Sequence, residues 1–291
     1  MKPNLLAYGE IIWDVYADHS VIGGATFNFA AHAARCGANV ALISAVGRDQ
    51  LGNGALGKLA HFGVDGRFVR RVAEPTGQCL VTLDENAVPR YRVLRNTAYD
   101  RIVLSADDLA DIRQSAFDAL CFGTLIQRDA VSRATLRRLV AECRFPNIIC
   151  DANLRPDCYD AESAAFCLRN ATVLKVSAEE EPLLRGMGFY CAVSDSPADI
   201  AKAICAAFPQ IRVVILTLGK DGAFAYTAGD GRSYRQPAIG DRVVSTVGAG
   251  DSFTAAWSAA YLSSKPMEEC LLRAAELSGY VVAHLAAVPE D

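Results

Sequence analysis

The chain has 291 residues, of which 52% are hydrophobic, and a formal net charge of −4 at neutral pH. This is enough apolar material for a large core, and the slight acidity argues against a nucleic-acid surface, which would need clustered Lys and Arg. No apolar run is long enough to span a membrane, and the N-terminus has too few apolar residues for a signal peptide. The ten cysteines include no CxxC pair, so we expect a reduced, cytoplasmic protein without nucleic-acid or membrane partners.

Short apolar runs alternate along the chain with longer segments of helical period. The runs that predict strands are Leu5–Ile12, Val40–Val46, Ala119–Thr124, Ile148–Asp151, Val173–Val176 and Val213–Thr217. The segments that predict helices are Phe27–Arg35, Leu51–Phe62, Ala130–Cys143, Ala198–Phe208 and Asp251–Leu262. Strands rich in Val, Ile and Leu between helices indicate an α/β fold with a mostly parallel central sheet and helices on both faces. Because no linker divides the chain, we expect one domain over residues 1–291.

One stretch, Gln78–Asp100, departs from this alternation. It predicts two strands, Cys79–Leu83 and Arg90–Leu94, joined through Asp84-Glu-Asn-Ala. A hairpin is not a crossover unit, so we expect it to project from the main sheet and to form a small β-sheet with Trp13–Ile22. These segments, about 13–22 and 78–100, would then be a lid that keeps water out of a site. A hairpin that only decorates the sheet edge is the alternative.

The most informative segment is Val243-Val-Ser-Thr-Val-Gly-Ala-Gly-Asp-Ser-Phe253, which leads into a strong helix former. Small residues at Gly248, Ala249 and Gly250 expose backbone N–H groups at the positive end of the helix dipole, an arrangement that binds phosphate. Asp251, in the first turn, would repel a bound phosphate. Its presence is explained if it accepts a proton from an attacking hydroxyl while the amides stabilise charge on the transferred group. Taken alone, the segment also fits an ordinary glycine-rich helix N-cap.

Neither a Walker-A motif nor GxGxxG is present, which argues against a P-loop kinase and a nicotinamide dehydrogenase. Thr246-Val-Gly-Ala-Gly-Asp-Ser-Phe253 instead resembles the C-terminal signature of PfkB/ribokinase-type carbohydrate kinases. Gly23-Gly-Ala-Thr-Phe-Asn-Phe-Ala30, with Gly37 and Val46-Gly-Arg-Asp-Gln-Leu-Gly52, is similar to the N-terminal signature of that family. Three landmarks follow in family order: Asp151-Ala-Asn-Leu-Arg155-Pro, Lys175-Val-Ser-Ala-Glu-Glu180 and Thr217-Leu-Gly-Lys-Asp-Gly222.

The resemblance spans the chain from Gly9 to about Pro289 and implies a ribokinase-like fold and an ATP-dependent kinase. It implies that Asp251 is the base and that the amides of Gly248, Ala249, Gly250 and Asp251 form an anion hole. The residues that it assigns to the acceptor are Asp14, Gly24, Asn28, Asn153 and Arg155. A carboxylate such as Asp14 can accept two hydroxyl hydrogen bonds at once. A helix cap is the alternative role for Asn28, and a structural salt bridge is the alternative for Arg155.

For the nucleotide, the resemblance implies binding by Ser177, Thr217, Gly219, Gly222 and Thr246, with a plain β-turn as the alternative reading of the glycines. Glu180 aligns with the glutamate that organises Mg²⁺ through water, in keeping with the reluctance of this ion to lose its hydration. The expected cofactors are therefore ATP and Mg²⁺. The four histidines, His19, His32, His61 and His284, show no paired spacing, and we assign none of them to metal or catalysis.

Gly9-Glu-x-x-Trp-Asp14 and the stretch from Val81 to Asp100 look most like bacterial fructokinases, so fructose is the expected acceptor. Phe27 and Tyr99 are expected as apolar walls or lid contacts of the sugar pocket. Ribose, a nucleoside or 2-keto-3-deoxygluconate are alternative acceptors, and Arg92, Arg95 or Arg155 could face an acid. A homodimer through the lid is a further expectation.

Three positions depart from the family pattern. Ser245 stands where relatives carry an aspartate that helps to bind a monovalent cation, so K⁺ activation is open. Ser177 replaces a common asparagine, and Ala275 replaces an asparagine near the adenine. These changes leave a second class of function open, a catalytically weak sugar-binding sensor.

Overall fold

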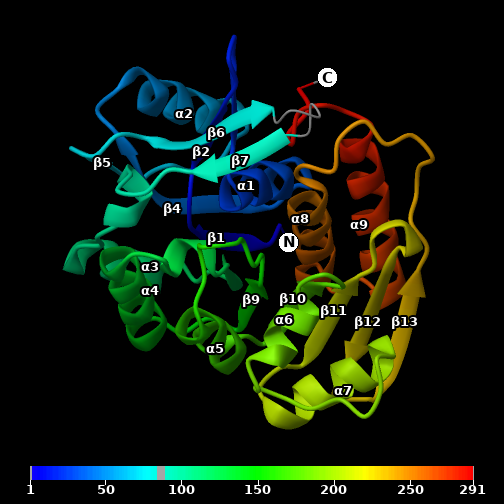
Figure 1. Cartoon of the computed structure of the whole chain (residues 1–291). Helices are drawn as coiled ribbons and strands as arrows, with labels where there is room; N and C mark the ends of the chain where they lie inside the picture. The colour runs from blue at the N-terminus through cyan, green and yellow to red at the C-terminus, as the bar shows by residue number, and fades with distance from the viewer. Residues whose placement is uncertain (1, 84–88, 291) are drawn as a thin grey trace.

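The structure is a computed structural model that describes residues 2–83 and 89–290. The strands of its main sheet are β1 (Asn4–Tyr8), β4 (Asn39–Gly47), β5 (Val69–Val72), β8 (Ala119–Phe122), β9 (Asn147–Asp151), β10 (Val173–Ser177), β11 (Val213–Thr217), β12 (Ala223–Thr227) and β13 (Arg232–Gln236). Within the described residues their order is β13-β12-β11-β10-β9-β8-β1-β4-β5. All neighbours from β11 to β5 pair in parallel, while β12 and β13 are antiparallel at one edge (Figure 1). The predicted α/β fold with a mostly parallel sheet is confirmed.

Helices cover both faces of this sheet and bury a separate core against each face. One core receives side chains from α3 (Ala106–Gln114), α4 (Ala130–Glu142), α5 (Ala161–Asn170), α6 (Glu181–Gly186) and α7 (Pro197–Ala207). The other receives side chains from α1 (Ala25–Arg35), α2 (Gln50–His61), α8 (Ala249–Leu262) and α9 (Met267–Val282).

Strand β1 explains why the sequence shows continuous apolar runs and not alternation. Leu6 and Tyr8 point into the first core, and Leu5 and Ala7 point into the second. Because successive side chains of a strand face opposite ways, a strand covered on both faces must be apolar throughout.

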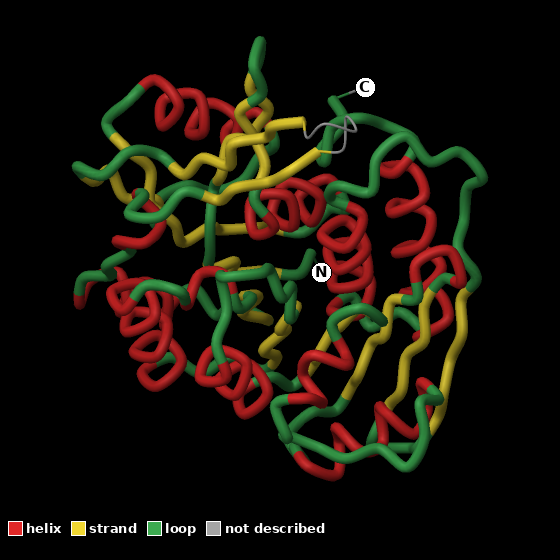
Figure 2. The backbone as a smooth tube through the Cα atoms, in the orientation of Figure 1, coloured by secondary structure: helices red, strands yellow, loops and turns green. Residues whose placement is uncertain are grey.

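The small sheet predicted from the hairpin is present. Its strands are β2 (Ile12–Val15), β3 (Ser20–Gly23), β6 (Gly77–Leu83) and β7 (Pro89–Val93), in the order β3-β2-β6-β7. The residues that join β6 to β7, 84–88, lie outside the described residues. In the views of Figures 1 and 2 this sheet lies at the top, away from helices α3 to α7 at the bottom.

Several boundaries differ from those predicted. The strand expected over Leu5–Ile12 ends at Tyr8, because the chain passes Gly9 in close contact with α1 and then enters β2. A Cβ on Gly9 would lie 1.9 Å from the Thr26 hydroxyl oxygen, a distance that only glycine allows. Helices α3, α5, α6 and α9 and strands β5, β12 and β13 were not predicted.

The ten cysteines form no disulfide bond with one another. Across residues 2–83 and 89–290, no helix combines the length and the apolar character needed to cross a bilayer.

Candidate active site

The glycine-rich segment forms the N-terminus of α8. Gly248 is the helix N-cap and has a φ of 81°, a left-handed conformation that suits glycine. Ala249, Gly250 and Asp251 then make up the first turn, as the sequence predicts. In the part of the chain that the structure describes, nothing accepts a hydrogen bond from the backbone N–H groups of Gly250 and Asp251. These donors, at the positive end of a 14-residue helix, are suited to hold an anion.

Asp251 is tied to α1 by a direct hydrogen bond. The Asn28 amide nitrogen donates to Asp251 Oδ2 over 2.8 Å. Burial raises the pKa of Asp251, and the Asn28 bond and the positive charges of Arg155 and Lys175 oppose that rise. The net direction is upward, so the Asp251 carboxylate is a stronger base than an exposed aspartate, which suits a group that accepts a proton.

Two of the residues predicted to bind the acceptor, Asp14 and Asn28, lie close to Gly23, two positions before α1 begins. Asp14 Oδ2 and Asn28 Oδ1 lie 3.7 Å and 3.8 Å from the position that a Cβ on Gly23 would occupy. Gly24 is the N-cap of α1, with a φ of 98°. Asn28 lies in the second turn and does not cap the helix, so the capping alternative is wrong. Its Oδ1 is buried and has no partner among the described residues, which leaves an acceptor available to a ligand.

Asn153 and Arg155 follow the end of β9, and Asn153 lines a hollow together with Asp251. Arg155 Nε donates to Asn153 Oδ1 over 3.2 Å. Burial raises the pKa of Asp14, and the Arg155 guanidinium opposes that rise, as it does for Asp251. Within the described residues no carboxylate lies close enough to Arg155 to form a salt bridge, so the structural alternative for this arginine is wrong. The guanidinium therefore has no partner of opposite charge among the described residues.

A buried ionic network supports the floor of the site. Lys175 Nζ lies 3.0 Å from Asp151 Oδ1, and the Thr254 hydroxyl donates to Asp151 Oδ2 over 2.9 Å. A Cβ on Gly250 would lie only 3.0 Å from Lys175 Nζ, so the ammonium lies directly beside the first turn of α8. Burial raises the pKa of Asp151, and the charge of Lys175 opposes that rise. The network fixes α8 to β9 and β10 and adds a positive charge next to the anion-binding amides.

The residues predicted to bind the nucleotide share the neighbouring part of the sheet edge. Ser177 and Thr217 are register partners at the carboxyl ends of β10 and β11. Gly219 and Gly222 have φ values of 56° and 87°, and a Cβ on Gly222 would lie 2.0 Å from the Gln236 carbonyl oxygen. The turn therefore requires glycine, whether or not it also contacts a nucleotide. Thr246 is exposed in the loop before α8, where its carbonyl accepts from the Ala249 N–H over 3.3 Å.

Glu180 connects the two halves of the site. Its Oε1 accepts from the Leu154 N–H over 2.8 Å, and its Oε2 accepts from the Ser177 N–H over 2.7 Å. Each oxygen keeps a second lone pair, which can accept from water. Among the described residues no three His, Cys, Asp or Glu side chains form a metal cage.

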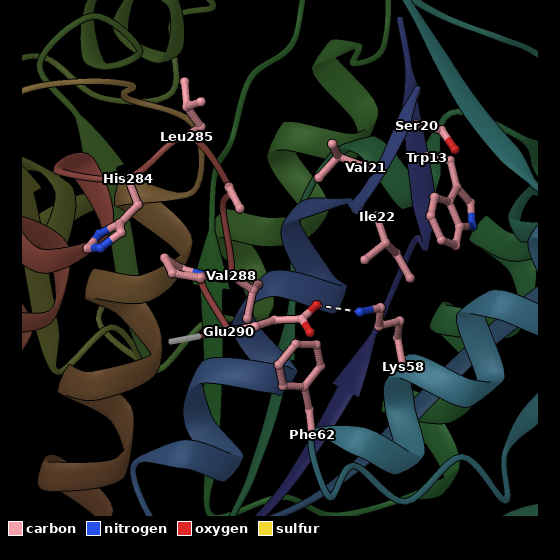
Figure 3. Close-up of a pocket in the computed structure, with 12 residues that line it drawn as sticks. Trp13, Ser20, Val21, Ile22, Lys58, Phe62, His284, Leu285, Val288 and Glu290 are labelled. Atoms are coloured by element: carbon pink, nitrogen blue, oxygen red, sulfur yellow. Dashed lines mark hydrogen bonds and ion pairs between the residues drawn. The ribbon is translucent and has the colours of Figure 1, made fainter. Parts of the chain in front are cut away.

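Two hollows lie near these residues. A hollow of about 30 Å³, the volume of roughly one water molecule, is lined by Glu10, Asp151, Asp251 and Asn153 among others. A larger one of about 400 Å³ is lined by residues of β2 and β3, by Phe62 and by C-terminal residues (Figure 3). Of these two hollows, only the small one is lined by Asp151 and Asp251.

Some expected site residues lie elsewhere. Phe27 and Tyr99 are fully buried core side chains, so they are not walls of an open sugar pocket. The ring of Phe27 packs edge-on against Phe62, and Arg128 lies over the ring of Tyr99. The second strand of the hairpin, β7, ends at Val93, within the predicted segment 78–100.

The arginines proposed for an acid substrate are separated by the fold. Arg95 donates to the backbone carbonyl of Asp157, and Arg92 is an exposed residue of β7. Arg155 alone of the three is linked electrostatically to Asp14 and Asp251.

Sequence reasoning missed two charged residues that support the site. Lys175 interrupts the apolar run Val173–Val176, and a lysine inside a buried strand signals an ion pair. Glu10 is 2% exposed, and it accepts from the N–H and hydroxyl of Thr26 in the first turn of α1. It therefore caps the helix that Gly24 cannot cap with a side chain. Its signal was a carboxylate inside the apolar run Leu5–Ile12.

The structure also gives the surroundings of Ser245 and Ala275, two of the residues that depart from the family pattern. Val244 and Ser245 donate their backbone N–H groups to the Val282 carbonyl over 2.7 Å and 3.2 Å, and the Ser245 hydroxyl accepts from the Val247 N–H. Ala275 is a buried residue of α9.

Comparison with known proteins gives one family. The model of the pfkB family carbohydrate kinase matches residues 2–289. An ATP-dependent 6-phosphofructokinase of Thermoanaerobacterium thermosaccharolyticum is 25% identical over 99% of this chain and 90% of its own length. A fructokinase of Klebsiella pneumoniae is 29% identical over 88% of this chain and 83% of its own length. A 2-dehydro-3-deoxygluconokinase of Bacillus subtilis is 28% identical over 87% of this chain and 81% of its own length.

Solved structures share the fold. A Vibrio cholerae O395 fructokinase in its fructose-, ADP- and calcium-bound form has a TM-score of 0.80 and 22% identity, with 98% of this chain and 94% of that chain covered. Arabidopsis thaliana ribokinase complexed with ribose and ATP has a TM-score of 0.76 and 23% identity, with 99% and 95% covered. At this identity the likeness shows the ribokinase-like fold.

Proposed function

The chain belongs to the PfkB family of carbohydrate kinases and is an ATP-dependent sugar kinase, and we propose that its acceptor is fructose. The single observation that best supports the proposed site is the contact between Asn28 and Asp251. It joins the N-terminal glycine signature to the C-terminal one, although 223 positions separate them in the chain. A carboxylate, an acceptor-binding amide and a phosphate-binding helix terminus are thereby brought to one place.

In the proposed reaction Asp251 accepts the proton of a sugar hydroxyl, and the hydroxyl oxygen attacks the γ-phosphorus of ATP. The bond from that phosphorus to the β,γ-bridging oxygen breaks, and ADP leaves. The amides of the first turn of α8 stabilise the charge on the equatorial oxygens, with Lys175 beside them. The Arg155 guanidinium, which has no carboxylate partner, faces the same charge.

The acceptor lies between the small sheet and α1 in this proposal. Asp14 and Asn28 hold its hydroxyls, and Gly23 and Gly24 let the backbone approach closely. The small sheet acts as a lid that keeps water from accepting the phosphoryl group. A homodimer through this lid remains a prediction from the sequence.

ATP lies along the carboxyl ends of β10 and β11 in this proposal, at Ser177, Thr217, Gly219, Gly222 and Thr246. Glu180 would hold Mg²⁺ through water, and the bound ion would neutralise phosphate charge. The two relatives of known structure carry adenine nucleotides and, in one, a divalent cation, which supports this arrangement.

A second acceptor class is favoured by one observation, the unpaired Arg155 near Asp14 and Asp251. A guanidinium there suits a sugar acid such as 2-keto-3-deoxygluconate as well as a transferred phosphate. The relatives include both a fructokinase and a 2-dehydro-3-deoxygluconokinase at similar identity, so the choice rests on experiment.

The test is coupled ADP release with Mg·ATP and a panel of fructose, other hexoses, ribose, 2-keto-3-deoxygluconate and nucleosides at equal concentration. A clear preference for fructose supports the proposal. Turnover of another acceptor keeps the reaction and overturns fructose. Binding of sugar and ATP with no turnover of any acceptor would favour a sensor over a kinase.

A further inference from the structure

The C-terminal tail, defined here as His284–Glu290, passes directly behind the anion-binding turn. A Cβ on Gly248 would lie 2.7 Å from Ala287 Cβ and 2.8 Å from the Ala287 backbone, so the tail and the N-cap of α8 touch without a gap. Val288 is buried in the core, and Glu290 forms an ion pair with Lys58 of α2. Figure 3 shows the tail from His284 past Val288 to this pair.

One face of α1 connects the tail to the catalytic base. Asn28, His32 and Arg35 are spaced i, i+4 and i+7, which places them on the same side of the helix. Asn28 donates to Asp251, His32 contacts the Ala287 carbonyl over 2.8 Å, and Arg35 donates to the Pro289 carbonyl. The helix that orients the base therefore also holds the tail.

The His32 contact has a defined direction. A carbonyl oxygen can only accept, so Nε2 of His32 carries the hydrogen and donates it to Ala287. The side chain is fully buried, and its Nδ1 has no partner among the described residues. Burial lowers the pKa of His32, which favours the neutral ring with one hydrogen on Nε2. A buried polar ring with an unmet nitrogen is a costly way to fill a core, and an apolar side chain would fill it better.

We propose that His32 is a positioning residue of the kinase reaction, which acts by holding Ala287 of the tail against Gly248. Gly248 begins the turn whose amides receive the transferred phosphoryl group, so a loosened tail lets this turn move. Backbone N–H groups stabilise the charge that develops during the reaction only when they lie at hydrogen-bond distance from it. A displaced turn should therefore lower kcat. This inference rests on the anion-hole role proposed above.

The test compares two variants of nearly equal size, His32→Gln and His32→Met. Glutamine can donate from its terminal nitrogen to the Ala287 carbonyl, and methionine cannot. We expect His32→Gln to keep kcat within about threefold of the wild-type value and His32→Met to lower it at least about tenfold. This loss is smaller than the loss expected when a hydrogen-bond donor to the transferred group is removed altogether. The KM for the sugar should change little in both variants. Equal kcat values in the two variants would overturn the proposal.

Hydrogen exchange measured by mass spectrometry provides a readout that does not depend on activity. In His32→Met, exchange should rise in the tail and in peptides that cover residues 248–251, and stay unchanged in α3 to α7. A general rise over the whole chain would overturn the proposal, because it would mark lost stability and not lost positioning. Should His32→Met fail to fold, His32→Gln decides: retained kcat supports the proposal and a drop beyond about tenfold overturns it.

The control is His61→Met, which removes an exposed histidine of α2 that lies 3.8 Å from Glu290 at the far end of the tail. We expect this variant to keep wild-type kcat. Failure of the proposed function has a different signature from failure of this inference: an Asp251→Asn variant that still turns over. His32 variants of equal kcat in an enzyme that needs Asp251 would overturn the tail contact alone.

Discussion

Replacing Asn28 by alanine should raise the pKa of Asp251 and move the acid limb of the kcat profile to higher pH. The Asn28 amide donates to the carboxylate over 2.8 Å, and this bond favours the ionised form. Asp251 must be ionised to accept a proton, so the rate falls as pH drops through its pKa. Without the donor the carboxyl is protonated over a wider range of pH, and activity is lost earlier on acidification.

The size of the shift follows from the type of bond. A hydrogen bond to a charged group contributes about 1.5–3 kcal/mol, and one pKa unit corresponds to about 1.4 kcal/mol, so a shift of roughly one to two units is expected. The other charges around Asp251 stay in place in this variant: Arg155 and Lys175 oppose protonation, and Glu10 and Asp151 favour it.

The assay is kcat at saturating sugar and ATP from about pH 5 to 9, with KM measured separately because Asn28 Oδ1 also faces the acceptor. Asn153→Ala is the matched control, since it removes a site amide that is not bonded to Asp251. An acid limb that stays in place in a folded Asn28→Ala enzyme would refute the role of this bond.

Further predictions concern the base, the cation and the ion pair below the site. Asp251→Asn should leave folding and ATP binding nearly intact and lower kcat at least about a hundredfold, and near-normal turnover would contradict a general base. Little stimulation by K⁺ over a large inert cation is expected because Ser245 carries no charge, and strong stimulation in a cation series would show that the ion still binds. Lys175→Met should cost about 3–5 kcal/mol in the free energy of unfolding, because it leaves Asp151 buried without its partner. In denaturant titrations Lys175→Met/Asp151→Asn should recover much of that loss, and a double variant no more stable than Lys175→Met would argue against the pair.

The sequence by itself determined the fold class, and it singled out Asp251 as the candidate base. Apolar runs such as Val213–Thr217 can only be strands covered on both faces, and they predict a parallel sheet with helices on either side. The run of small residues before Asp251 predicts a phosphate-binding helix terminus, because only glycine permits the backbone at Gly248. Both signals are local in the chain, and local chemistry determines them.

Tertiary structure alone decided which distant residues meet. Asn28 carries the same side chain whether it caps a helix or holds a base, and the packing of α1 against α8 decides between the two. Phe27 and Tyr99 are aromatic wherever they lie, and the fold buries both away from the pocket. Nothing in the sequence predicted a role for His32, because its partner is a backbone carbonyl 255 positions away. Every backbone carbonyl looks alike in a sequence, so contacts to them appear only when the chain is folded.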